Sequence, residues 1–171
     1  MLDVTTTNEG RFDLVAGGYD AGIHLGEFIE RDMIGQGVTD QRAAIVASPC
    51  YFEWHPKPES PHDLTHHRCL NFRHGSAGVY RWEFDKGSQS LAVAVQGPLI
   101  VDKVELIIQA AIDGVGLAFM LEAHTAPHLA SGAFLRVLED SCPPFAGYFL
   151  YYPSRRQQPA ALSALIETLR L

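Results

Sequence analysis

The chain has 171 residues, of which 47% are hydrophobic, and its 13 Lys and Arg against 20 Asp and Glu give a net charge of −7. A chain of this length can bury enough surface to fold without disulfides or a metal, and its abundant apolar residues exclude a disordered protein. The acidic balance argues against a surface that grips the phosphate backbone of DNA.

Short apolar strands alternate with helical segments along the chain, which indicates an α/β fold with largely parallel sheets. Helical spacing from Phe12 to Tyr19 predicts a helix that the glycine pair 17–18 closes. Further helices are expected after Ser48-Pro49, after Ser60-Pro61, between Asp102 and Gly114, and over 162–169. Strands are expected at 2–6, 20–25, 42–48, 69–72, 82–84, 91–95, 116–120, 134–138 and 147–152.

The two most apolar long strands, 42–48 and 147–152, bracket everything between them. In a two-lobed protein such strands would cross between the lobes. We therefore expect lobe I to comprise 1–45 and 146–171, and lobe II to comprise 46–145.

The three cysteines form no C-x-x-C pair, and an odd number cannot all be paired in disulfides within the chain. This favours a reducing compartment, the cytoplasm. The first residues resemble no signal peptide, and no apolar run is long enough to span a membrane. The chain opens directly on a strand-like run, so Met1 is expected to be a start inside a longer protein.

The sequence offers no motif for catalysis: the G-x-S-x-G, Walker A, G-x-G-x-x-G and H-E-x-x-H patterns are absent. No enzyme, no metal and no cofactor is therefore expected. The histidines in 62–69, with Cys69, and the pair His124 and His128 could be zinc ligands by type. Their simpler interpretation as surface or capping residues is favoured, because no closed ligand set is present.

The loop from Arg73 to Gly78 is the strongest candidate binding feature. A glycine-rich turn after a strand, with an arginine beside it, can receive a small anion in an α/β crevice. Asp102 and the helix after it would form another wall, and the threonines at 5–7 add hydroxyl groups. Alternatively, Thr7 caps a helix and Arg73 pairs with a surface carboxylate.

Six segments in this order resemble the effector-binding domain of LysR-type transcriptional regulators, over essentially the whole chain. They are DAGIHLGE (20–27), VASPCYF (46–52), PHDL to HRC (61–69), WEF (82–84), AAIDGVGLA (110–118) and YYPSRR (151–156).

The resemblance implies a type 2 periplasmic-binding-protein-like fold, with two α/β lobes, two hinge-crossing strands and a small-molecule effector in the inter-lobe cleft. It also implies that lobe I lacks its first strand and helix, and that the DNA-binding domain is absent from this chain. The expected effector-binding residues are Thr6, Thr7, Ser48, Phe72, Arg73, Ser76, Val101, Asp102 and Phe119.

The expected function follows from this resemblance. The effector, anionic if Arg73 binds it, would alter how subunits pack as dimers or tetramers and how the whole regulator bends promoter DNA. DNA would be contacted only through the absent N-terminal domain, and no membrane is involved. The alternative is a stand-alone solute-binding protein of a transporter, which shares the fold but requires export.

Overall fold

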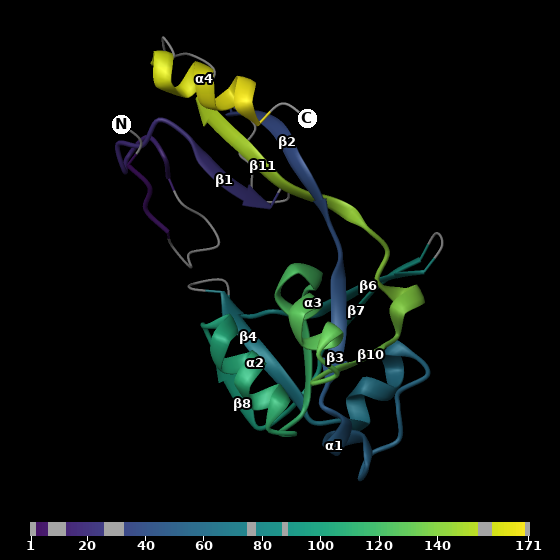
Figure 1. The fold of residues 1–171 in the computed structure, drawn as a ribbon. Helices are drawn as coiled ribbons and strands as arrows, with labels where there is room; N and C mark the ends of the chain where they lie inside the picture. The colour runs from purple at the N-terminus through teal and green to yellow at the C-terminus, as the bar shows by residue number, and fades with distance from the viewer. Residues whose placement is uncertain are drawn as a thin grey trace. The chain divides into compact units, whose positions relative to one another are not determined.

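The computed structural model describes residues 3–6, 13–25, 33–74, 78–86, 89–153 and 159–169. The chain folds into two compact units (Figure 1). The first unit comprises Met1–Gln41 and Phe145–Leu171, and the second unit comprises Arg42–Pro144. The chain therefore passes from the first unit to the second after residue 41 and returns after residue 144.

The first unit contains an antiparallel sheet in the order β1-β11-β2, with one helix packed on it. Its strands are β1 (Gly22–Leu25), β2 (Met33–Gln41) and β11 (Phe145–Pro153), and its helix is α4 (Ala160–Thr168). Leu150 and Tyr152 of β11 bury one face of the sheet against Leu162 and Ile166 of α4. These contacts confirm the strand predicted at 147–152 and the final helix.

Two expectations for the first unit are wrong. The predicted helix before Tyr19 is a turn in the described residues, because the Asp13 carboxylate accepts the Ala16 N–H and Gly18, at φ +74°, ends the chain reversal. Residues 3–6 form no strand.

The second unit is built on a sheet in the order β10-β3-β9-β4-β5, with β8 paired to β4. Only the pairs β4–β8 and β4–β9 are parallel among these strands, so the sheet is mixed rather than largely parallel as expected. The strands are β3 (Ala43–Ala47), β4 (Cys69–His74), β5 (Gly78–Val79), β8 (Leu99–Val101), β9 (Leu117–Leu121) and β10 (Leu135–Val137). A separate hairpin joins β6 (Trp82–Lys86) to β7 (Gln89–Val93).

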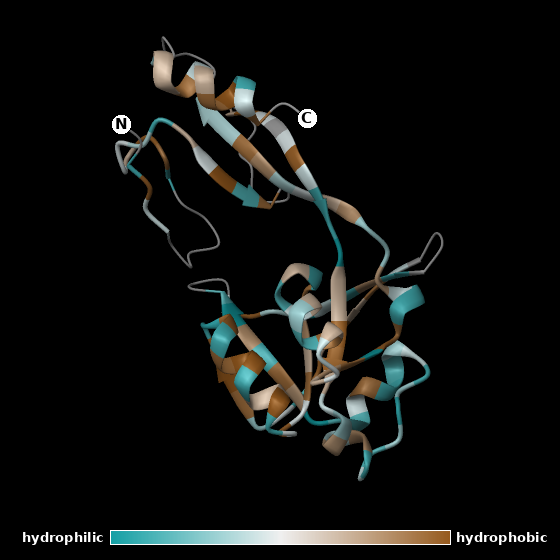
Figure 2. Ribbon diagram, viewed as in Figure 1, coloured by the Kyte–Doolittle hydropathy of each residue, from teal (hydrophilic) through white to brown (hydrophobic). Residues whose placement is uncertain are grey.

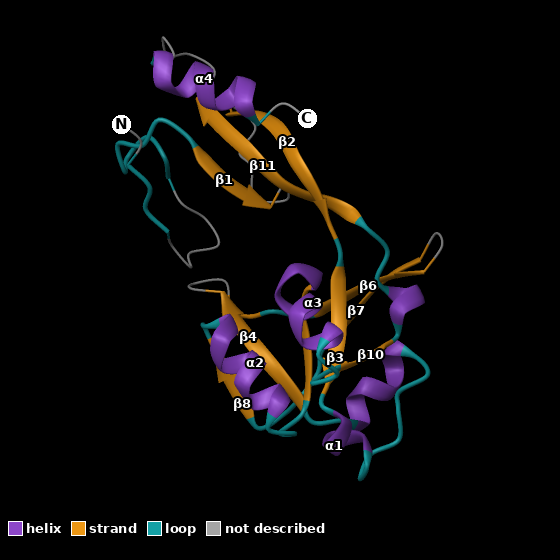
Figure 3. Cartoon of the chain, viewed as in Figure 1, coloured by secondary structure: helices purple, strands orange, loops and turns teal. Residues whose placement is uncertain are grey.

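Two helices of the second unit begin at the Ser-Pro pairs that the sequence predicts as helix starts, and Figure 3 shows the helices of this unit. Helix α1 (Pro49–Phe52) starts after Ser48, and the 3-10 helix η2 (Pro61–His66) starts after Ser60, whose capping box includes Asp63. Helix α2 (Val104–Ile112) begins with Lys103 rather than Asp102 at its N-cap. The unit also contains α3 (Glu122–Ala130) and the 3-10 helix η4 (Glu139–Ser141).

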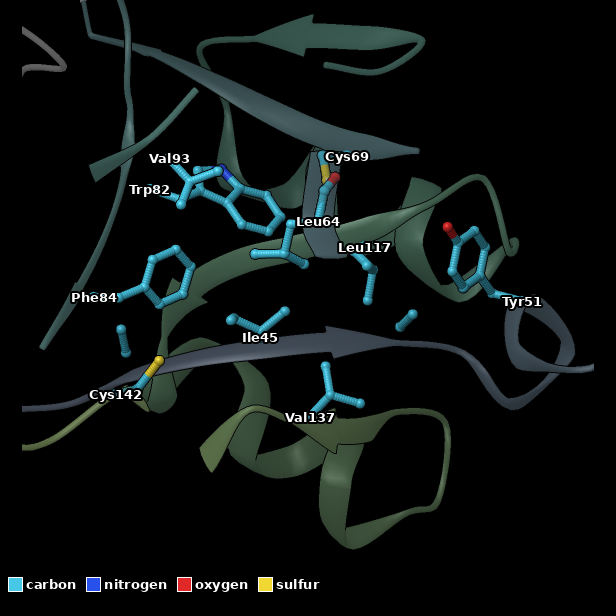
Figure 4. Packing of buried hydrophobic residues seen from close by; sticks show 12 residues of the cluster. Ile45, Tyr51, Leu64, Cys69, Trp82, Phe84, Val93, Leu117, Val137 and Cys142 are labelled. Atoms are coloured by element: carbon cyan, nitrogen blue, oxygen red, sulfur yellow. The ribbon is translucent and has the colours of Figure 1, made fainter. Parts of the chain in front are cut away.

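Both faces of this sheet are buried, as the unbroken apolar run of β3 predicts. One face packs against α2 and α3, and Figure 2 shows both hydrophobic and hydrophilic residues along α2. The other face packs against α1, η2 and the β6–β7 hairpin. Figure 4 shows this second cluster, with Trp82 and Phe84 at one end and Tyr51 at the other.

Arg42 ties together the two ends of the second unit. Its Nε–H donates to the Cys142 carbonyl at 2.8 Å, and its guanidinium also bonds the Glu139 carbonyl and carboxylate. Arg136 bonds Glu122 and the Ala43 carbonyl beside it. The strand that enters this unit is thereby fixed to the segment that leaves it.

No helix of the described residues is long and apolar enough to cross a membrane.

Candidate functional site

The carboxyl ends of β4, β8 and β9 meet at one edge of the second unit's sheet. They share this edge because β4 runs parallel to both neighbours, with Phe72 opposite Val101 and Cys69 opposite Leu117. We call this the carboxyl edge and define it by residues 71–74, 100–102 and 119–121. In α/β sheets the carboxyl ends of parallel strands are where ligands bind.

The structure brings five of the predicted site residues to the carboxyl edge. Phe72 and Arg73 lie at the end of β4, Val101 and Asp102 at the end of β8, and Phe119 within β9. Phe72, Val101 and Phe119 are half-buried, while Arg73 and Asp102 are exposed.

Of the other four predicted residues, Ser48 lies away from this edge. Ser48 is buried and follows the far end of β3, because β3 runs antiparallel to β9 with Ala43 opposite Leu121. Thr6 is exposed and belongs to the first unit. Thr7 and Ser76 lie outside the described residues.

The site residues divide between the two faces of the sheet. Phe72 and Val101 pack in the cluster beneath α2, whereas Phe119 packs in the opposite cluster with Trp82 and Phe84. Since side chains alternate along a strand, Arg73 shares the face of Cys69, which belongs to the Phe119 cluster. The edge therefore presents an arginine on the face that carries Phe119.

A chain of aromatic contacts follows the carboxyl edge. The ring of Phe72 lies 4.7 Å from that of His74, which lies 5.5 Å from Tyr80, and Tyr80 lies 6.0 Å from Phe119. Phe119 stacks at 5.5 Å on the buried Trp82. Such separations are typical of favourable aromatic pairs. The outer members are only half-buried, so flat ring surface is available at this edge.

Arg73 supplies the positive charge of the carboxyl edge. Within the described part of the chain its guanidinium forms no ion pair and no side-chain hydrogen bond, so the surface pairing considered as an alternative is not observed among those residues. Its strand position is fixed, because Arg73 pairs with Val79 of β5. An exposed guanidinium with five N–H donors can bind a carboxylate or a phosphate in bidentate geometry.

The structure adds one residue that the sequence prediction missed. Asn71 is 3% exposed, and its Oδ1 accepts no hydrogen bond from the protein in the described residues. The feature of the sequence that could have pointed to Asn71 is its position as a single amide in the otherwise apolar start of β4, CLNF at 69–72. A buried polar atom of this kind requires an explanation.

The histidine groups do not form a metal centre among the described residues. His67 instead shares a hydrogen bond of 3.0 Å between its Nδ1 and the Tyr51 hydroxyl, which also accepts the Arg68 N–H. The ring of His55 stacks on Tyr51 at 4.2 Å. Burial lowers the pKa of His67 and raises that of Tyr51. This cluster holds α1 to the segment before β4, at the opposite end from the carboxyl edge.

Comparison with known proteins identifies relatives over nearly the whole chain. The family model of the LysR substrate binding domain matches residues 2–171. A candidate transcriptional regulator of Pseudomonas aeruginosa is 46% identical over 165 residues, which cover 95% of this chain and 54% of that protein. The HTH-type transcriptional regulator PgrR of Escherichia coli is 35% identical, covering 96% of this chain and 56% of the relative.

Solved structures show the same fold. The regulatory domain of an AphB variant from Vibrio vulnificus has a TM-score of 0.75 at 20% identity, covering 89% of this chain and 75% of that one. The CrgA regulatory domain of Neisseria meningitidis has a TM-score of 0.72 at 18% identity, covering 91% and 76%. The chain spans about half the length of the curated relatives it matches.

Proposed function

Because this chain belongs to the family of LysR substrate-binding domains, we propose that its second unit binds a small anionic effector at the carboxyl edge and so controls a DNA-binding transcriptional regulator. The observation that carries the proposal is Arg73, whose exposed guanidinium has no ion-pair partner among the described residues. The HTH-type regulators among the relatives support the DNA-binding role of the whole protein. The family model and the relatives described above give no support to the transporter alternative.

The proposed mechanism is a population shift between two arrangements of the assembled regulator. An effector can change an equilibrium only if it binds one arrangement more tightly than the other. We propose that the regulator works as a dimer or tetramer in the cytoplasm, that its DNA contacts lie outside this chain, and that it binds the effector without chemical turnover. A net charge of −7 fits a chain that does not itself hold DNA.

The binding proposal is tested by calorimetric titration of the chain with small anions and their uncharged analogues. The set includes succinate, glucose 6-phosphate and phenylacetate, with succinamide, glucose and phenylacetamide as the matched neutral compounds. For any anion that binds, Arg73→Ala should weaken binding roughly tenfold or more, since a hydrogen-bonded charge pair contributes about 1.5–3 kcal/mol.

Arg81→Ala is the matched control, because Arg81 is also an exposed arginine of the second unit. It should leave the affinity unchanged, and both variants should keep the melting temperature of the unmodified chain. Equal affinity of the Arg73→Ala variant and the unmodified chain for the anion would show that Arg73 does not take part in binding. Self-association is tested separately by light scattering, where a monomer at high concentration would contradict it.

A further inference from the structure

The buried amide of Asn71 is unusual for its position in the sheet. Its Oδ1 is enclosed and accepts no hydrogen bond from the described protein, although the residue is only 3% exposed. Folded proteins rarely leave a buried carbonyl oxygen without a donor, and the exceptions often serve a ligand or an ordered water. The amide therefore indicates where a hydrogen-bond donor from outside the chain would be accommodated.

The register of the sheet places Asn71 directly beside the residues of the carboxyl edge. Asn71 pairs with Ile100 of β8, and by alternation it shares the face of Cys69 and Arg73 on β4. Ile100 is 44% exposed, so solvent reaches the β8 neighbour of the enclosed Asn71. On the other side, β4 pairs with β9 at Cys69–Leu117 and Leu70–Ala118, and the next residues along the two strands are Asn71 and Phe119.

The separation between Asn71 and Arg73 restricts the distance between the two groups of a ligand that binds both residues. Two residues on one face of a strand are roughly 6.6 Å apart along the strand axis. That distance is comparable to the separation of two para substituents on a six-membered ring. The half-buried rings of Tyr80 and Phe119, whose centroids are 6.0 Å apart, pack in the cluster on the face of Asn71 and Arg73 and provide flat surface for such a ring.

We propose that Asn71 determines the specificity of this site: its Oδ1 receives a hydrogen bond from an O–H or N–H group on a planar ring compound whose anionic group binds Arg73. This inference rests on the proposed function and names the class of effector. It assigns the recognition of a donor group to Asn71, the binding of the charge to Arg73 and the contact with the ring to Tyr80 and Phe119. A ring compound with an acceptor only at that position would leave Oδ1 unsatisfied.

The test compares three ring anions that differ at one substituent: 4-hydroxyphenylacetate, phenylacetate and 4-methoxyphenylacetate. Only the first can donate a hydrogen bond to Asn71. The unmodified chain should bind it roughly threefold to tenfold more tightly than the other two, the range that one net hydrogen bond supplies. Titration calorimetry measures the three dissociation constants.

The variant Asn71→Leu isolates the hydrogen bond, because Leu has a similar shape and no acceptor. Its preference for 4-hydroxyphenylacetate should fall to at most about twofold by the loss of that hydrogen bond. The matched control is Gln109→Leu, which removes an exposed amide of α2 and should keep the full preference. The ratio of affinities is the readout, since a merely structural role of Asn71 would change stability and leave this ratio unaltered.

Two results would overturn the inference. One is equal binding of the hydroxy and methoxy compounds by the unmodified chain, a comparison that needs no variant to fold. The other is an unchanged preference in Asn71→Leu. If no ring anion binds, the assignment of the effector class is also wrong, while the succinate and glucose 6-phosphate titrations decide the proposed function independently.

Discussion

Gly97 provides a demanding test of the packing at the start of β4, the end opposite the carboxyl edge. It precedes β8 and lies against the backbone of Cys69, the first residue of β4. A Cβ added at Gly97 would overlap the Cys69 carbonyl oxygen and would lie 2.5 Å from the Cys69 nitrogen. Because these are backbone atoms, no side chain can rotate away, and the segment before β8 would have to move.

The expected cost of Gly97→Ala follows from three contributions. Moving the segment breaks the 2.9 Å hydrogen bond from the Cys69 N–H to the Gln96 carbonyl, worth about 0.5–1.5 kcal/mol. Displacing packed neighbours costs about 1–3 kcal/mol. Alanine in place of glycine raises the free energy of unfolding by about 0.4–1 kcal/mol, because it restricts the conformations of the unfolded chain. We therefore expect a net loss of about 2 kcal/mol in the free energy of unfolding.

Urea denaturation followed by circular dichroism measures this loss. Gly37→Ala is the matched control, because its added Cβ would meet only Phe149 Cε1 at 3.7 Å, an ordinary contact. It should change the free energy of unfolding by less than about 1 kcal/mol. If Gly97→Ala proves as stable as Gly37→Ala, the described approach of this segment to β4 is incorrect.

Two further predictions concern titratable groups. Burial holds the pKa of His67 below its usual value, so the unfolded chain binds the additional proton first, and stability should fall as the pH drops below about 6.5. Urea midpoints between pH 8 and 5 measure this, and the variant His67→Gln should show a weaker decline; an equal decline would contradict the assignment. Burial also raises the pKa of Cys69 to about 12 and that of Cys142 to about 11, so both thiols stay protonated and unreactive at pH 8. Mass spectrometry after iodoacetamide should find Cys50, the exposed cysteine, modified first, and early modification of either buried thiol would refute the prediction.

Local signals in the sequence determined several elements of the second unit. The run at 42–48 has polar side chains only at its ends, Arg42 and Ser48, and β3 between them is buried at every position. The pairs Ser48-Pro49 and Ser60-Pro61 mark helix starts because serine and proline suit these backbone positions. Gly114, at φ +75°, ends the chain reversal after α2. These features depend on near neighbours in the chain, so a single sequence contains them.

Strand β2 illustrates what neighbours in space decide. Its sequence, MIGQGVTDQ, contains two glycines and little apolar alternation, and the sequence did not predict it. It forms a strand because it pairs with β11 along most of its length, with Tyr152 opposite Ile34 and Phe149 opposite Gly37. The pairing partner lies more than a hundred residues away, where no local pattern can indicate it.

The candidate site shows the same division. The sequence pointed to Arg73 and Asp102 through the glycine-rich loop and the expected helix start, and the resemblance to LysR-type regulators added Phe72, Val101 and Phe119; the structure places all five at the carboxyl edge. Only the tertiary structure separated Ser48 from them, since the direction of β3 relative to β9 is a property of the sheet. Likewise, that Oδ1 of Asn71 has no hydrogen-bond donor among the described residues depends on every group packed around it, and such an enclosure exists only once distant strands have come together.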